Sequence, residues 1–77
     1  MNATQHVYEV LRQSFGVDAQ AVPDDTALQQ LRMDSLALEE FRVLIEERLD
    51  IDLDDARITS RDTVAHLVHV VAARATS

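Results

Sequence analysis

Apolar residues recur three and four positions apart in three segments of this chain, the spacing that gives a helix one buried face. The spacing predicts a helix over residues 4–14, a second from Ser35 to about Leu49, and a third that begins after Asp62 or Thr63. A chain of 77 residues without cysteine must be stabilised by helix packing alone, since no disulfide can form. We therefore expect one all-α domain that spans residues 1–77.

The segments between these helices carry few signals of regular structure. Residues 17–33 contain the only proline, Pro23, and predict a long loop with a short helical turn over residues 25–31. Residues 50–55 alternate polar and apolar side chains, but a single strand without a partner is not stable. We therefore expect an extended linker anchored by Leu53.

Three further signals complete the expected bundle. Gly16, the only glycine, follows the first helix where a left-handed cap is favoured. A short helix is expected over residues 54–58, and Thr59 with Asp62 offers a competing start for the last helix. The expected core consists of Val7, Leu11, Phe15, Leu28, Phe41, Leu44, Ile45, Leu49, Leu53, Val64, Leu67, Val68 and Val71.

Net charge excludes some classes of partner and favours others. The formal charge of −7 argues against nucleic acid, whose phosphates require clustered cations, and favours basic protein surfaces. All seven cations are arginine, so no lysine is present for Schiff-base chemistry. No apolar run approaches the ~20 residues that cross a bilayer, and no secretion signal begins the chain. We expect a free-standing, monomeric, cytoplasmic protein without a membrane partner.

Asp34, Ser35 and Leu36 stand where the polar loop meets the second helix. Alone, such a tripeptide indicates only a helix cap. Here Leu31 lies four residues before the serine, acidic residues follow it, and a closing helix comes about 30 residues later. This pattern resembles the modification site of the acyl carrier and peptidyl carrier proteins, the family that bears phosphopantetheine.

The resemblance implies a four-helix bundle of acyl-carrier type, with three longer helices and one short helix. It implies that a phosphopantetheinyl transferase attaches phosphopantetheine from coenzyme A to the Ser35 hydroxyl, and that Asp34 serves recognition by this transferase. A helix N-terminus suits a phosphodiester because its first N–H groups are unpaired. The family usually has glycine three positions before the serine, where this chain has Arg32. Arg32 could pair with the phosphate or with Asp34, and could alter partner choice.

The resemblance also implies a docking surface for enzymes with basic patches, such as a ketosynthase, an acyltransferase, or adenylating and condensing enzymes. Its expected residues are Leu36, Glu39, Glu40, Val43, Glu46 and Glu47, with Arg42 interrupting the acidic stripe. The alternative interpretation is an ordinary solvated acidic helix face. We expect a carrier of polyketide or nonribosomal peptide intermediates. Fatty-acid synthesis, a single amino acid such as D-alanine, and an unmodified acidic interaction module are the alternatives.

Catalytic and metal sites are not expected. Asp62, His66 and His69 share a helix face and have ligand chemistry that suits zinc, but they equally suit the polar side of a terminal helix. A serine hydrolase would need a base, an orienting acid and an oxyanion hole near Ser35, and no Gly-x-Ser-x-Gly motif is present. We therefore expect a non-catalytic carrier without a metal.

Overall fold

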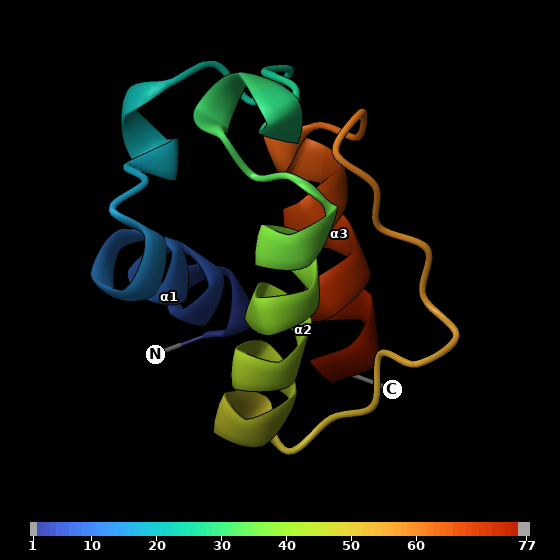
Figure 1. Cartoon of the computed structure of the whole chain (residues 1–77). Helices are drawn as coiled ribbons and strands as arrows, with labels where there is room; N and C mark the ends of the chain where they lie inside the picture. Colours follow the sequence, from blue (N-terminus) through green and yellow to red (C-terminus); the bar gives the residue numbers. More distant parts are fainter. Residues whose placement is uncertain (1, 76–77) are drawn as a thin grey trace.

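The computed structural model describes residues 2–75, in which three α-helices are joined by two long connecting segments (Figure 1). The helices are α1 (Ala3–Phe15), α2 (Ser35–Leu49) and α3 (Val64–Ala75), and the first connection contains two 3-10 turns, η1 (Ala19–Ala21) and η2 (Leu28–Leu31). Residues 2–75 contain no strand, only a single antiparallel bridge between Ala27 and Thr63. The all-α prediction is confirmed.

Both ends of α1 are closed by local interactions. The Asn2 side chain accepts a hydrogen bond from the backbone N–H of Gln5, and the Gln5 side chain accepts one from the backbone N–H of Asn2. At the other end Gly16 has a φ of 67°, and its N–H donates to the carbonyl of Arg12. The single glycine therefore ends the helix in the predicted left-handed cap.

The short helix expected over residues 54–58 does not form in the described chain. A turn occupies Asp54 and Asp55 instead, and the N–H of Ala56 donates to the carbonyl of Leu53 at 3.0 Å. Consecutive aspartates favour turns over helix interiors because their short polar side chains compete for backbone groups. Leu53 is fully buried, so the predicted anchor of this extended segment is confirmed.

The last helix begins at the second of its two predicted caps. The Thr63 hydroxyl accepts a hydrogen bond from the backbone N–H of His66 at 3.1 Å. Asp62 has a different function, because its carboxylate accepts from the backbone N–H of Thr59 at 2.8 Å. The competing capping pattern therefore closes a turn before α3 and does not start the helix.

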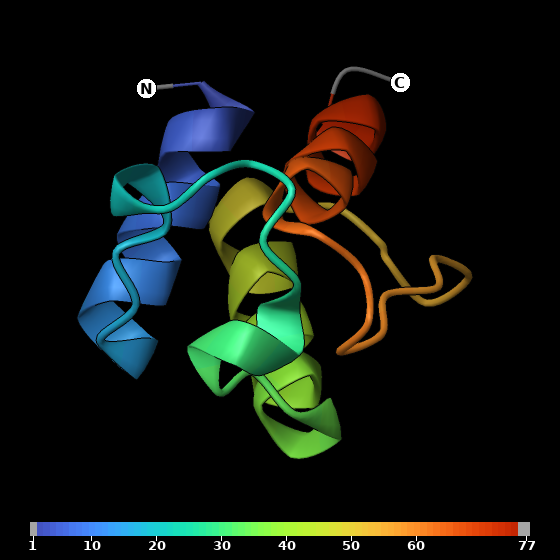
Figure 2. The same cartoon turned by 90° about the horizontal axis from the view of Figure 1, so that it is seen from above.

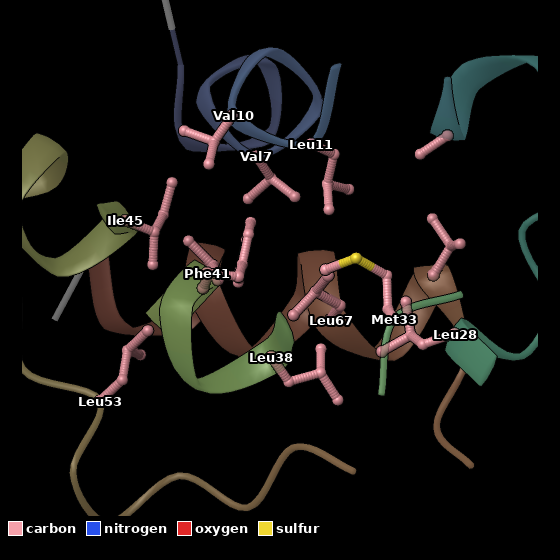
Figure 3. Packing of buried hydrophobic residues seen from close by; sticks show 13 residues of the cluster. Val7, Val10, Leu11, Leu28, Met33, Leu38, Phe41, Ile45, Leu53 and Leu67 are labelled. Carbon is pink, nitrogen blue, oxygen red and sulfur yellow. The ribbon is translucent and has the colours of Figure 1, made fainter. Parts of the chain in front are cut away.

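The core lies between the three helices, where side chains of α1 point toward α2 and α3 (Figure 3). Buried hydrophobic residues are Val7, Val10, Leu11, Ala19, Leu28, Met33, Leu38, Phe41, Ile45, Leu53, Val64, Leu67 and Val71. Phe15, Leu49 and Val68 are partly buried against this cluster. Placing Leu44 in the core was wrong, since it is 37% exposed. The buried face of α2 follows Leu38, Phe41 and Ile45, which leaves Leu44 on the adjacent side.

Backbone hydrogen bonds tie the first connection to the start of α3. The N–H of Leu28 donates to the carbonyl of Asp62 at 2.8 Å, and that of Gln29 donates to the carbonyl of Ser60 at 2.8 Å. In return, the N–H of Val64 donates to the carbonyl of Thr26 at 3.0 Å. Figure 2 shows this segment passing the first turn of α3 on its way to η2 and α2. The segment that leads to Ser35 is therefore fixed by the residues just before α3 and at its start.

Candidate functional site

Ser35 is the first residue of α2 and its side chain is exposed. Asp34 is the N-cap, and its Oδ1 accepts a hydrogen bond from the backbone N–H of Ala37 at 2.9 Å. The N–H groups in this first turn have no acceptor within the helix, and they carry the positive end of the helix dipole. An anion attached to the Ser35 hydroxyl would lie close to these donors.

The segment before Ser35 contains an unusual backbone conformation at Arg32. Arg32 has a φ of 64°, in the left-handed region, and its N–H closes η2 by donating to the carbonyl of Gln29 at 3.2 Å. Glycine adopts this conformation without the steric penalty of a Cβ atom. The positive φ therefore explains why the carrier proteins that this chain resembles usually have glycine at this position. Among the ion pairs of residues 2–75, none joins Arg32 to Asp34.

Met33 fixes the same segment from the inside. Its side chain is 1% exposed, and its N–H donates to the carbonyl of Leu28 at 3.1 Å. Met33 precedes the Asp34 cap and Leu38 lies four residues after it, which are the two positions of a hydrophobic staple. Both side chains are buried, whereas sequence reasoning placed neither in the core. Apolar residues just before the predicted cap and four residues after it are typical of a hydrophobic staple, and this pattern could have predicted that Met33 and Leu38 are buried.

A cleft of about 440 Å³ begins at Ser35 and lies between the first turns of α2 and the segment after it. Residues from both sides line this cleft: Ser35, Leu38, Glu39, Arg42, Asp54, Ala56, Ile58 and Thr59. Arg42 is seven residues after Ser35 and therefore lies on the same helix face, two turns further along α2. A group attached to Ser35 can thus extend along the cleft toward Arg42.

Arg42 joins the two walls of this cleft through three carboxylates. Its guanidinium lies 2.8 Å from Asp54 Oδ1 and 3.3 Å from Glu46 Oε1, and it also contacts Glu39 Oε1. The other oxygen of Glu46 accepts a hydrogen bond from the backbone N–H of Leu53 at 2.7 Å. The hydrogen bond that Arg42 donates to Glu39 and the surrounding carboxylates raise the pKa of Arg42 above its ordinary value, against a smaller opposing effect of desolvation. The guanidinium therefore stays charged and holds the segment after α2 against the helix.

A second surface of α2 is apolar and faces solvent. Leu36 is 70% exposed, Val43 is 44% exposed and Leu44 is 37% exposed. With Glu39 and Glu40 these residues line a shallow hollow of about 370 Å³, which we call the Leu36 patch. Single exposed apolar residues are common, but three that line one hollow form a contiguous apolar surface. Leu44 was not among the predicted docking residues, because its position was assigned to the core.

The remaining predicted docking residues lie outside the Leu36 patch. Glu47 is exposed and lines a neighbouring groove between α1 and α2, with Val10, Ser14, Leu44 and Arg48. Glu46 has a side chain only 19% exposed, and its two oxygens are engaged by Arg42 and by the Leu53 N–H. Glu46 therefore holds the segment after α2 against the helix, and its carboxylate is not available for docking.

The possible zinc ligands do not converge within residues 2–75. The His66 Nε2 atom is 4.0 Å from Asp62 Oδ2, and His69 does not join them in a three-ligand group. Glu46, Asp52 and Asp54 do lie within 4.8 Å of one another, but Arg42 already occupies oxygens of Glu46 and Asp54. Within the same residues, no helix has the length and apolar character needed to cross a membrane.

Comparison with known proteins adds an independent observation to this geometry. A family model described as a phosphopantetheine attachment site matches residues 5–71, which is most of the chain and includes all of α2. No match was found among the curated proteins or among the solved structures.

Proposed function

Because the chain belongs to the family of phosphopantetheine-binding proteins, we propose that Ser35 is the residue that bears its covalently attached phosphopantetheine. Carrier domains of this family hold intermediates and are generally not catalysts themselves. The exposed position of Ser35 at the N-terminus of α2 is the observation that supports this assignment most strongly.

The proposed attachment is a single phosphoryl-group transfer from coenzyme A. The Ser35 Oγ attacks the phosphorus nearest the pantetheine, a new P–O bond forms, and the pyrophosphate P–O bond breaks. Adenosine 3′,5′-bisphosphate leaves, and the hydroxyl proton passes to a base of the phosphopantetheinyl transferase. This chain supplies the nucleophilic oxygen and its placement, and the transferase supplies the catalytic groups.

The residues around Ser35 fit a phosphodiester. The side chain faces solvent, and the first turn of α2 offers N–H groups without helical acceptors. Such an anion gains about 0.3–1 kcal/mol from an exposed helix N-terminus. One carboxylate oxygen of Asp34 caps the helix, and its second oxygen can contribute to a cation site of the transferase. The buried Met33 and the backbone bonds of η2 hold the serine in place.

The Leu36 patch is the proposed docking surface for partner enzymes. Leu36, Val43 and Leu44 supply apolar contacts, while Glu39 and Glu40 at its edge attract basic surfaces. Glu47 extends the acidic charge toward α1. Interfaces obtain most of their affinity from a few buried anchors surrounded by polar residues, and this surface has that composition.

We assign the carrier to polyketide or nonribosomal peptide biosynthesis. Arg32 in place of the usual glycine sets this chain apart from the carriers of fatty-acid synthesis, which are the alternative together with single-amino-acid carriers. Its expected partners are a phosphopantetheinyl transferase and ketosynthase, acyltransferase, adenylating or condensing enzymes. For each of these partners, the phosphopantetheine arm tethers the intermediate and so raises its effective concentration at the next enzyme.

Intact mass spectrometry tests the attachment site. The protein is incubated with coenzyme A and a broad-range phosphopantetheinyl transferase, and one added phosphopantetheine is expected. Ser35→Ala should abolish the added mass, whereas Ser14→Ala, which removes an exposed hydroxyl from α1, should leave it unchanged. If several transferases leave the wild-type mass unaltered, the chain is an unmodified interaction module and the proposal fails.

A further inference from the structure

Two segments flank Ser35, and every charged side chain on them is an arginine. Residues 26–33 lead into α2, and residues 56–61 pass from one wall of the Ser35 cleft to the turn before α3. The first segment contains Arg32, the second contains Arg57 and Arg61, and neither has an acidic residue. The whole chain has 14 acidic residues, so these two segments are locally cationic on an acidic protein.

Both segments lie at the end of the bundle where α2 begins. Figure 1 shows η2 and the start of α3 at the same end as the first turn of α2. The carbonyls on either side of Arg61 accept hydrogen bonds from the backbone of η2. Arg57 stands between two residues that line the cleft beginning at Ser35, and Arg32 ends η2 three residues before the serine. All three arginines therefore border the attachment residue.

The side chains of these arginines are exposed and have no carboxylate partner. Three other arginines are paired, whereas no ion pair within the described part of the chain, residues 2–75, includes Arg32, Arg57 or Arg61. Their planar N–H donors, which match a phosphate as well as a carboxylate, are therefore available. Arg32 also has its Cβ at a positive φ, and proteins retain such a backbone cost mainly at functional positions.

Loading brings a phosphate-rich molecule to this end of the bundle. Coenzyme A carries a diphosphate and a separate phosphate on its ribose, and the diphosphate must reach the Ser35 hydroxyl before transfer. The carboxylate of Asp34, next to the serine, repels these phosphates. On this chain, the N-terminus of α2 and the three arginines are the groups beside Ser35 that attract them.

We propose that Arg32, Arg57 and Arg61 form an arginine rim that binds the phosphates of coenzyme A while the transferase holds it. The inference rests on the proposed attachment at Ser35, and adds that the carrier itself supplies part of the coenzyme site. The three are positioning residues. They direct the diphosphate toward the hydroxyl and hold the departing adenosine bisphosphate, but take no proton, because guanidinium stays charged.

Equilibrium binding to a broad-range phosphopantetheinyl transferase tests the arginine rim. Ser35→Ala is the starting protein, because without the hydroxyl the carrier, coenzyme and enzyme assemble but no transfer follows. Isothermal titration calorimetry measures its affinity for the transferase with and without coenzyme A. Adding Arg32→Gln, Arg57→Gln or Arg61→Gln should weaken binding to the coenzyme A complex about two- to fivefold, the range of an exposed ion pair. Binding to the transferase alone should not change, since the lost contact is to the coenzyme.

Matched variants separate the arginine rim from the total charge of the protein. Arg12→Gln removes the same charge from α1, in a hollow that shares no residue with the Ser35 cleft, and should change neither affinity. Arg32→Lys keeps the charge and should retain part of the affinity that Arg32→Gln loses. Amide spectra of each variant establish that the fold is retained.

Two results would overturn the inference. The arginines contact the enzyme and not the coenzyme if the glutamine variants bind the free transferase as weakly as its coenzyme A complex. The arginines have no part in loading if both affinities stay at their starting values. Failure of the unaltered chain to gain the mass of phosphopantetheine would instead refute the attachment at Ser35, so the two failures are distinguishable.

Discussion

Asp34 caps the helix that Ser35 begins, with its carboxylate 2.9 Å from the backbone N–H of Ala37. The residue expected to serve the transferase is therefore also part of the fold. A loss of loading in a variant of Asp34 could arise from either function, and the two must be separated by the choice of substitution.

Asp34→Ala and Asp34→Asn should separate these functions. Alanine removes the cap and should lower the free energy of unfolding by about 1 kcal/mol, whereas asparagine caps helices as well as aspartate does. If the carboxylate serves the transferase, both variants lose loading but only Asp34→Ala loses stability. Urea denaturation and mass spectrometry measure the two effects. Normal loading of Asp34→Asn would show that the negative charge has no part in recognition.

Arg32→Gly should stabilise the protein. The left-handed conformation at φ 64° costs a residue with a Cβ about 1–2 kcal/mol, while glycine adds about 0.5–1 kcal/mol of conformational entropy to the unfolded chain. The expected net gain in the free energy of unfolding is about 0–1.5 kcal/mol. Arg32→Ala is the control, because it removes the same side chain and keeps the backbone penalty. Equal stability of the two variants would contradict the role assigned to the backbone.

Met33→Ala should damage stability and loading together. The buried side chain leaves a cavity, and a buried methionine replaced by alanine costs about 2–5 kcal/mol. Because Met33 anchors the segment before Ser35, the rate of loading should fall even at temperatures where the variant remains folded. Met33→Leu conserves most of the volume and should cost less than about 1.5 kcal/mol. Wild-type loading by folded Met33→Ala would show that this anchor does not position the serine.

Leu36→Ala should weaken the reaction with a partner enzyme, whereas Leu38→Ala, only two positions away, should lower the stability of the fold. Leu36 is 70% exposed, so its truncation should change stability by less than about 0.5 kcal/mol but weaken partner turnover about fivefold or more. Leu38 is 6% exposed, and its truncation should cost about 2–5 kcal/mol. Thermal unfolding and kcat/KM of a partner enzyme with each loaded variant measure the difference. Unchanged kcat/KM for Leu36→Ala would remove this residue from the docking surface.

Local patterns in the sequence predicted the three helices, while Ser35 as the attachment residue stays a prediction. Helical spacing identified Val7, Leu11 and Phe41 as core residues, and the only glycine identified the end of α1. The assignment of Leu44 to the core failed because spacing alone does not fix which side of α2 the other helices cover. The expected helix after α2 failed because the need to bury Leu53 and the turn-forming aspartates both oppose it.

Contacts between distant residues were beyond the reach of these patterns. Arg42 appeared only as an interruption of an acidic stripe, since nothing in the sequence links it to Asp54, twelve residues later. The left-handed backbone at Arg32 and Asp50 could not be predicted from the sequence either, because this conformation is typical of glycine and not of arginine or aspartate. The cleft and its charge depend on these contacts, and therefore became visible only in three dimensions.

The hydrogen bonds from Leu28 and Gln29 to Asp62 and Ser60 give the timing of modification a structural basis. The two acceptor carbonyls lie 34 and 31 residues after their donors in the chain. Before residues 60–64 are in place, the segment that precedes Ser35 lacks these two hydrogen bonds. We therefore expect a transferase to load this domain only after residues 60–64 and α3 have packed against the segment before Ser35.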